Sequence, residues 1–450
     1  MEMTHRQAVD NEVAELCGFG YALVRVAPSL KFQLDAATGK LERACRRARL
    51  AYHAELHCEQ FAQSLRRCWL QYSAIGPSRV YRSPTSAQQA RLDAMPLSDE
   101  FGYERDISPL SLEQRCAGFF PPAPPNWRVT HLLFSSGQAA MTSALLSLQG
   151  AWGRARIGVR HLGAYFETRA LLDAQPAYIE TLDDGDPRAA DCLIIEPVAC
   201  DGNFRCVDIK AVAAHYSTGA PRPRAAIFDT TLLGLTDAVQ AFLLELGPEA
   251  HPLVLNVSSG LKLFQAGLEL ANVGVLSLFE RKRSEAGVTI EGLRRLRTLT
   301  GGGLRFSDAI ALQAPWVFDA ATAGAHEDAV FANNAALAHA LHGDAGLFEP
   351  VSHPSFHGAN APYCAFRLRH ASVHAYQQLD AGIMREARRR RVLIDRGGSF
   401  GFRGHRFEVV EPETNEAPFL RIAMGRRQGW SSDGVIALMR DLARTTRLPG

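Results

Sequence analysis

The chain has 450 residues, 47% of them hydrophobic, which is enough to bury the cores of two or three domains. Its 49 lysines and arginines nearly balance 47 acidic residues, so the composition argues against nucleic acid or a membrane as the partner. No apolar signal core or long apolar run occurs, and the nine cysteines lack the close pairs of a zinc site. We expect a cytoplasmic protein with reduced thiols, a small-molecule substrate and no bound metal.

The first hundred residues predict an N-terminal, mainly helical extension. Apolar positions recur at three- and four-residue spacing in this part, for example over residues 51–72. This extension carries no recognisable chemistry. A proline-rich stretch at 121–127 then interrupts a helical pattern and leads into an apolar strand at 129–134, followed by a turn and a helix over 135–150.

Strand and helix patterns alternate from there to about residue 300. Further strands are predicted at 156–162, 192–198, 225–231 and 252–258. Several of them are continuously apolar, which is typical of parallel strands buried on both faces. The sequence therefore predicts a large α/β domain over 101–300 with a mixed, mostly parallel sheet. After the glycines at 301–303, a long helix and short strand patterns predict a smaller α+β domain over 301–450.

Polar residues stand where these predicted strands end, and ligands of such sheets collect there. Ser136, Gly137 and Gln138 form a small-residue turn whose backbone N–H groups could bind a phosphate at the start of a helix. Such a turn also serves simply to start a helix. Asp229 ends the strand at 225–231, where a carboxylate can keep a pyridine nitrogen protonated; a turn or helix-capping aspartate is the alternative.

A lysine and an arginine complete this set. Lys262 follows the strand at 252–258, with Ser258 and Ser259 available for a phosphate, and is placed to form a Schiff base. Arg421 lies in a strand-like segment and could clamp a substrate carboxylate with two hydrogen bonds, although a structural ion pair explains it equally well. Few lysines compete with Lys262. The others are Lys31, Lys40, Lys210 and Lys282.

The order of these motifs resembles the Cys/Met-metabolism (transsulfuration, cystathionine gamma-synthase-like) family of fold-type I pyridoxal 5′-phosphate enzymes. The resemblance covers about residues 101–430 in collinear order. It includes the segment YERDISP at 103–109, the turn at 136–140, Tyr165 in YFET and Ser399 in GGSFG. The resemblance implies a fold-type I transferase fold and pyridoxal 5′-phosphate (PLP) as cofactor.

The resemblance also implies a role for each matching residue. Tyr103 and Arg105 would reach the phosphate of a neighbouring subunit's cofactor, which implies a homodimer or homotetramer with shared active sites. Tyr165 would stack on the cofactor ring, and Ser399 would help Arg421 bind the substrate carboxylate. The matching residues, listed in chain order, are Tyr103, Arg105, Ser136, Gly137, Gln138, Tyr165, Asp229, Ser259, Lys262, Ser399 and Arg421.

The sequence departs from the family pattern at the expected site. The usual S-x-T-K becomes SGLK at 259–262, which removes a hydroxyl beside the lysine. YGGT becomes YFET, so that Phe166 and Glu167 would narrow the site or change its charge. These differences indicate a divergent member, one of specialised metabolism. We expect replacement or elimination at the γ or β carbon of an amino acid with a leaving group, such as an O-acylhomoserine or a sulfonium amino acid.

Two alternatives remain open at this point. An aminotransferase or decarboxylase of the same fold would keep Lys262, Asp229 and Arg421 but would not need Tyr103 and Arg105. A PLP-fold binding or regulatory protein would bind a ligand without turnover, and its N-terminal helices would serve as an interaction module.

Overall fold

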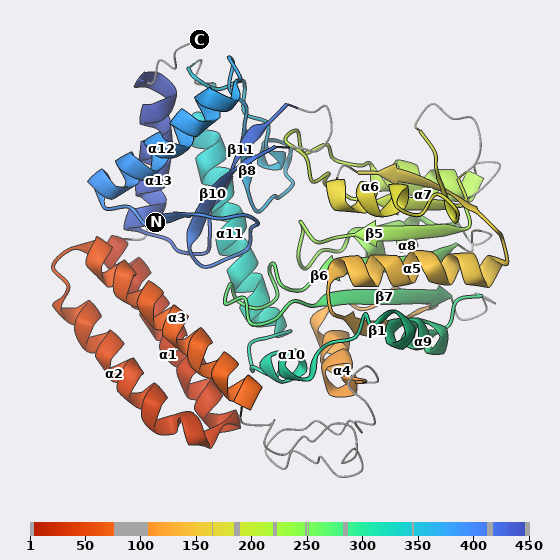
Figure 1. The fold of residues 1–450 in the computed structure, drawn as a ribbon, viewed down its shortest axis with the longest axis horizontal. Helices are drawn as coiled ribbons and strands as arrows, with labels where there is room; N and C mark the ends of the chain where they lie inside the picture. Colours follow the sequence, from red (N-terminus) through yellow and green to blue (C-terminus); the bar gives the residue numbers. More distant parts are fainter. Residues whose placement is uncertain are drawn as a thin grey trace.

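The computed structural model describes residues 4–75, 107–163, 165–183, 190–218, 223–247, 250, 252–281, 287–343, 346–411 and 417–445. Figure 1 shows a helical bundle formed by the N-terminal helices, a large sheet flanked by helices, and a smaller sheet near the C-terminus. Among the described residues, no helix has both the length and the apolar character to cross a bilayer.

The large sheet has seven strands in the order β1-β7-β6-β5-β4-β2-β3. Six of these strands run in one direction, and β7 alone runs antiparallel to both of its neighbours. Their bounds are β1 (Trp127–Phe134), β2 (Ile157–Leu162), β3 (Ile179–Thr181), β4 (Cys192–Ile195), β5 (Ala225–Asp229), β6 (Leu253–Ser259) and β7 (Gly274–Arg281). The central strands are buried along their length because helices cover both faces.

Helices of the large sheet divide between its two faces. One face packs against α5 (Gly137–Trp152), α6 (Phe166–Asp173) and α9 (Ile290–Thr300). The other face packs against α7 (Ile209–Thr218) and α8 (Ala238–Glu245). A further helix, α4 (Leu110–Phe119), packs against β1. This doubly wound arrangement brings the carboxyl ends of β4, β5 and β6 to one edge.

The smaller sheet has four strands in the order β8-β11-β10-β9. Its strands are β8 (Cys364–Phe366), β9 (Ile394–Arg396), β10 (His405–Val410) and β11 (Phe419–Ala423). Its core includes side chains of α11 (Ala320–Leu341), α12 (Val373–Arg390) and α13 (Trp430–Thr445). The described chain also forms the short helix α10 (Phe306–Ala311) and two 3-10 helices, η1 (Pro28–Leu30) and η4 (Pro354–His357).

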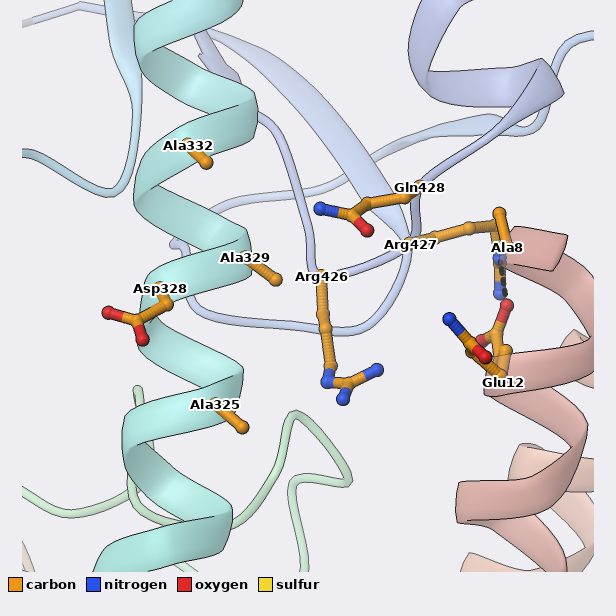
Figure 2. A pocket seen from close by; sticks show the side chains of 10 residues that line it. Ala8, Glu12, Ala325, Asp328, Ala329, Ala332, Arg426, Arg427 and Gln428 are labelled. Carbon is orange, nitrogen blue, oxygen red and sulfur yellow. Dashed lines mark hydrogen bonds and ion pairs between the residues drawn. The ribbon is translucent and has the colours of Figure 1, made fainter. Parts of the chain in front are cut away.

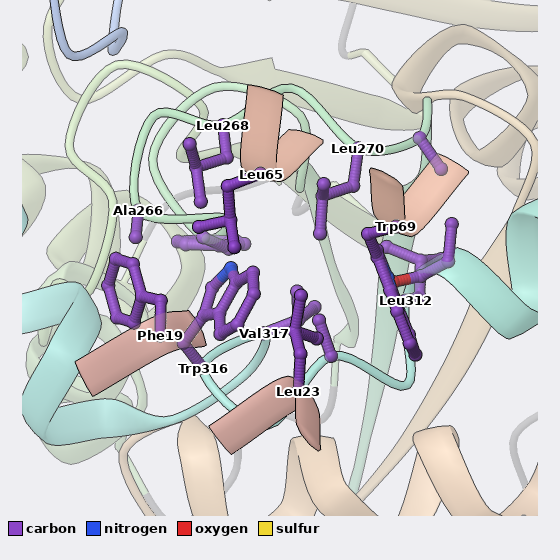
Figure 3. Close-up of a cluster of buried hydrophobic side chains, with 14 of the residues drawn as sticks. Phe19, Leu23, Leu65, Trp69, Ala266, Leu268, Leu270, Leu312, Trp316 and Val317 are labelled. Carbon is purple, nitrogen blue, oxygen red and sulfur yellow. The ribbon is translucent and has the colours of Figure 1, made fainter. Parts of the chain in front are cut away.

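The N-terminal bundle packs against the protein rather than extending from it. It consists of α1 (His5–Val26), α2 (Lys31–Arg47) and α3 (Ala51–Ile75). Leu65 and Trp69 of α3 are fully buried, and the Trp69 indole donates a hydrogen bond of 2.8 Å to the carbonyl oxygen of Ala311 in α10. Figure 3 shows the buried hydrophobic cluster to which Leu65 and Trp69 belong, and this cluster includes Leu268 and Leu270. The bundle therefore covers the loop that leads from Lys262 to β7.

A buried charge network fixes the other end of the bundle. The Arg427 guanidinium contacts Glu12 of α1 and Glu59 of α3, while Arg403 reaches Glu15. Figure 2 shows the side of this junction where Arg426 lies between α11 and α1 and lines a surface cavity of about 420 Å³. Its guanidinium pairs with Glu15 of α1 at 2.7 Å. Arg427 and Glu12 are almost fully buried, so detaching the bundle would leave each of these charges without its partner.

The predicted α/β fold class, with a smaller α+β part, is confirmed. The predicted strands correspond to β1, β2, β4, β5 and β6, with ends shifted by up to three residues. Strand β7 was not predicted, because its pattern GVLSLFER follows β6 without an intervening helix. The division at residues 100 and 300 stays a prediction.

Candidate active site

A cavity of about 450 Å³ lies where the parallel strands end. It is bordered by the residues that follow β4, β5 and β6, by the first turns of α5 and α6, and by the segment 398–400 with Arg421 of β11. The structure thus brings together residues that are up to 285 positions apart, from Ser136 to Arg421. Nine of the eleven residues predicted for the site line this cavity. They are Ser136, Gly137, Gln138, Tyr165, Asp229, Ser259, Lys262, Ser399 and Arg421.

Tyr103 and Arg105, the two remaining predicted residues, lie outside the described residues. Their proposed contact with a neighbouring subunit stays a prediction.

The turn before α5 forms a narrow cradle. The Ser136 hydroxyl caps the helix by accepting a hydrogen bond of 3.0 Å from the Ala139 N–H. Gly137 lies against Ser259, since a β-carbon there would come within 3.6 Å of the serine β-carbon. Gly274 must be glycine, because a β-carbon there would meet the Ser136 carbonyl oxygen at 2.1 Å. The end of β6 and the start of β7 therefore lie against the N-terminus of α5, which is the positive end of its dipole.

One side-chain atom in this cradle has no partner. The Gln138 Oε1 is buried and accepts no hydrogen bond within the described chain. Buried polar atoms are nearly always paired in folded proteins, so an unpaired one inside a cavity points to a missing ligand. Its carboxamide could donate to an anion in the flipped orientation.

The Asp229 carboxylate forms no ion pair with any residue that the structure describes. It ends β5, and its Oδ1 accepts a hydrogen bond of 3.0 Å from the Thr231 N–H. Burial, reinforced by the negative charge of Glu196, raises its pKa to about 6. A positively charged group bound in the cavity would restore ionisation of this carboxylate.

Lys262 is the lysine of this cavity. It lies in the turn after β6, and its Nζ hydrogen-bonds to the Ser399 Oγ and lies 5.6 Å from the centre of the Phe400 ring. Burial and the nearby charge of Arg421 lower its pKa. A larger share of Lys262 is consequently uncharged and nucleophilic than for a lysine in water.

The two serines beside Lys262 differ in orientation. Ser259 lines the cavity, and its N–H donates a hydrogen bond of 3.0 Å to the Thr231 hydroxyl. Ser258 is fully buried and pairs with the Thr230 hydroxyl at 2.7 Å, on the opposite side of β6. The expectation that Ser258 is available for a phosphate is wrong, because successive side chains of a strand point to opposite faces.

Arg421 has a partner within the site. It lies directly across from Glu408 on the neighbouring strand β10, and both its Nε and Nη2 bond to the Glu408 Oε1. The same oxygen accepts the Ser399 N–H at 3.2 Å. The ion pair that the sequence left open is therefore present, and it occupies one edge of the guanidinium fork.

Tyr165 begins α6 at the cavity wall. Its N–H donates a hydrogen bond of 3.0 Å to the Glu196 carboxylate, which fixes the start of the helix. Burial, followed by a hydrogen bond to Glu167, raises the pKa of its hydroxyl. The Tyr165 hydroxyl is therefore protonated at neutral pH and can donate.

Sequence reasoning missed a buried pair beneath Tyr165. Glu196 follows β4 and His161 lies near the end of strand β2, and the His161 Nε2 and the Glu196 Oε1 are 2.8 Å apart. Burial opposes ionisation of Glu196, but the hydrogen bond from His161 prevails and lowers its pKa. Cys200, which also lines the cavity, donates its N–H to the same carboxylate. A charged residue directly after a buried apolar strand was the signal that could have found Glu196.

No family model matches the chain, and no curated protein matches it in sequence. Solved structures do match. Cystathionine gamma-lyase from yeast shares 16% identity at a TM-score of 0.57, over 83% of this chain and 96% of that one. A methionine gamma-lyase from Micromonospora echinospora shares 19% identity at a TM-score of 0.53, over 76% and 88% of the two chains.

A protein of Campylobacter jejuni, assigned as an O-acetylhomoserine (thiol)-lyase, shares 16% identity at a TM-score of 0.53, over 81% and 93% of the two chains. That structure contains a lysine joined to pyridoxyl phosphate. Identities this low accompany a divergent sequence on a shared architecture. The chain has the fold of the fold-type I PLP-dependent enzymes.

Proposed function

We propose that the chain is a PLP-dependent lyase or transferase that binds its cofactor through Lys262. The observation that carries this proposal is the meeting of the Lys262 amine and the Asp229 carboxylate in one cavity, at the ends of the neighbouring strands β6 and β5. The α5 turn closes the same cavity at a third position. An amine, an acid and an anion cradle are the three contacts that PLP requires.

The residues present fit this cofactor. The Gln138 Oε1 that lacks a partner lies at the cradle proposed for the phosphate, together with Ser136, Gly137 and Ser259. Asp229 has the raised pKa of a carboxylate that lacks a cation, which a protonated pyridine nitrogen would supply. When bound, the cofactor withdraws electrons from the substrate Cα.

Each remaining residue then has a definable task. The Lys262 amine, its pKa lowered, takes and returns the proton of the substrate Cα, and the Ser399 hydroxyl holds that amine in position. Asp229 keeps the proton on the ring nitrogen. Tyr165 would stack on the ring, as the family resemblance implies, and its protonated hydroxyl could donate to a departing group.

The substrate is an amino acid whose γ or β substituent leaves. Arg421 would bind the α-carboxylate through the guanidinium edge that Glu408 does not occupy, with Ser399 nearby. The turn SGQAA at 136–140 resembles that of O-acylhomoserine sulfhydrylases, which favours γ-replacement. An aminotransferase or decarboxylase of the same fold is the second candidate, since Lys262, Asp229 and Arg421 would serve it equally.

We further propose a homodimer or homotetramer in the cytoplasm. Leu261 leaves the phosphate cradle one hydroxyl short, and a phenol and a guanidinium from Tyr103 and Arg105 of a second subunit would complete it. The N-terminal bundle covers the loop after Lys262 and would therefore hold the lysine turn rigid.

Incubation of the purified protein with a panel of amino acids tests the function. O-acetylhomoserine should release acetate, and a sulfonium amino acid should release a thioether. Formation of a keto acid and the amine form of the cofactor, with no other product, would assign the protein to the aminotransferases instead. Lys262→Ala should lose the visible absorbance of the bound cofactor. If reduction with borohydride fixes the cofactor to another lysine, the assignment of Lys262 is wrong.

A further inference from the structure

The mouth of the cavity carries two aromatic rings and a carboxylate on consecutive residues. Tyr165 and Phe166 lie with ring centres 5.3 Å apart at 65°, and both line the cavity. Phe166 is 46% exposed, which is unusual for a phenylalanine in a helix whose other face is packed. Glu167 follows in the first turn of α6 and lines the same cavity. The exposed aromatic surface therefore faces the open space rather than a core.

Glu167 lines the cavity as an acid that pairs with no described cation and that has no task in binding the proposed cofactor. Glu196 pairs with His161, Glu408 pairs with Arg421, and Asp229 faces the proposed position of the ring nitrogen. Glu167 raises the pKa of the Tyr165 hydroxyl and forms no ion pair with any residue that the structure describes. Glu167 lines the same cavity as Lys262, where its charge partly opposes the lowering of the lysine pKa by burial and by Arg421.

Aromatic faces combined with a carboxylate are the recognition chemistry of onium cations. Ring faces attract a positive charge through their quadrupole, and quaternary and other alkylated cations keep this attraction because they hold water weakly. A neutral ester group gains nothing from Glu167, and an anionic phosphate ester would be repelled. The mouth thus discriminates among leaving groups by charge.

We propose that this site selects amino acids whose leaving group is a sulfonium cation, which Glu167 and Phe166 hold at the cavity mouth. The proposal rests on the function proposed above and specifies its substrate class. Glu167 and Phe166 are specificity residues here, because they contact the departing group rather than the bond to Cα.

The charge balance of the reaction predicts a particular kinetic signature. When the bond between Cγ and sulfur breaks, sulfur takes both electrons and leaves as a neutral thioether, while the base at Lys262 takes a proton from the substrate carbon. The positive charge that Glu167 attracts is greatest before the bond breaks and vanishes afterwards. Its attraction therefore lowers KM for the sulfonium substrate without raising kcat.

The test compares Glu167→Gln with Glu291→Gln in the holoenzyme. Glu291 is a matched control, because it also is an exposed glutamate at the second position of a helix, α9, but does not line the cavity. Each variant is assayed with S-methyl-L-methionine and with the neutral O-acetyl-L-homoserine. Equilibrium binding of S-methyl-L-methionine is also measured against L-ethionine, a neutral sulfide with the same number of heavy atoms.

In Glu167→Gln we expect KM and Kd for S-methyl-L-methionine to rise about fivefold, the size of a partly exposed ion pair, with kcat unchanged or slightly higher. Values for O-acetyl-L-homoserine and L-ethionine should stay within about twofold, and Glu291→Gln should resemble the wild type. Phe166→Leu should weaken binding of the sulfonium compound by a further factor of about two to five, because it removes the ring but keeps an apolar side chain.

Two results would overturn the proposal. One is a loss of affinity in Glu167→Gln that is equal for charged and neutral compounds, and the other is no loss at all. Failure of the proposed function looks different: the wild type would then release neither acetate nor thioether. If S-methyl-L-methionine still bound more tightly than L-ethionine through Glu167 in that case, the recognition would stand while the reaction would need revision.

Discussion

Asp229→Asn in the cofactor-free protein is expected to increase stability at neutral pH. Asp229 must ionise in a cavity beside the Glu196 carboxylate, and these surroundings raise its pKa from 3.8 to about 6. Asparagine keeps an oxygen that can accept the Thr231 N–H, but it carries no charge to desolvate. The substitution thus removes an electrostatic penalty and retains the hydrogen bond.

The magnitude follows from the raised pKa. Above pH 6, holding this carboxyl ionised costs roughly 3 kcal/mol, since a tenfold change in an equilibrium is worth about 1.4 kcal/mol. The cavity is open to water, so we expect about half of that, near 1.5 kcal/mol. Because the folded protein binds the proton more tightly than the unfolded chain, stability is lost as pH rises from 3.8 through 6. The advantage of Asp229→Asn should therefore grow over this range and nearly vanish at pH 4.

Urea denaturation of both proteins, stripped of cofactor, at pH 4 and pH 7.5 measures this difference. Cofactor addition at pH 7.5 should then stabilise the wild type more than the variant, because only the wild type can pair a carboxylate with a protonated ring nitrogen. A variant that is no more stable than the wild type at pH 7.5, or equally more stable at both pH values, would refute the reasoning.

Three further predictions concern the rest of the site and its support. Arg421→Lys keeps the charge but loses the fork, so KM for the amino-acid substrate should rise about tenfold in steady-state assays while the cofactor spectrum stays unchanged. Mixing inactive Arg105→Ala with inactive Lys262→Ala should restore part of the activity; no recovery despite demonstrated subunit exchange would contradict the shared site. Trp69→Ala should lower the free energy of unfolding by about 3–5 kcal/mol in urea titrations, because it leaves a cavity against α10 and removes the bond to Ala311.

Local pattern was sufficient to find five of the six strands that run in one direction through the large sheet, and it missed the three-residue strand β3. Several of them are short, continuous apolar segments, and helical patterns separate most of them from the next strand, so the alternation is visible in the sequence. Strands β7 and β10 were also not predicted. Strand β7 returns from β6 through an irregular loop over 260–273, and the pattern HRFEVV of β10 is short and interrupted by charges.

The site residues could be predicted because chemistry at the end of a strand is a local signal. Lys262 and Asp229 each follow an apolar strand, and strand ends of a parallel sheet meet at one edge regardless of the loops between them. Partners of these residues were not predictable in this way. Glu408 meets Arg421 because β10 and β11 pair in one register, and a shift of one residue would turn Glu408 to the other face.

For the N-terminal helices too, the sequence predicted the local structure but not the tertiary contacts. Their amphipathic spacing predicted that helices form, since the apolar positions of a helix recur every three to four residues. Nothing in that spacing specified what the apolar face covers. Only the folded chain places Trp69 against α10 and the bundle over the loop after Lys262, because such contacts depend on the shapes of surfaces more than two hundred residues apart.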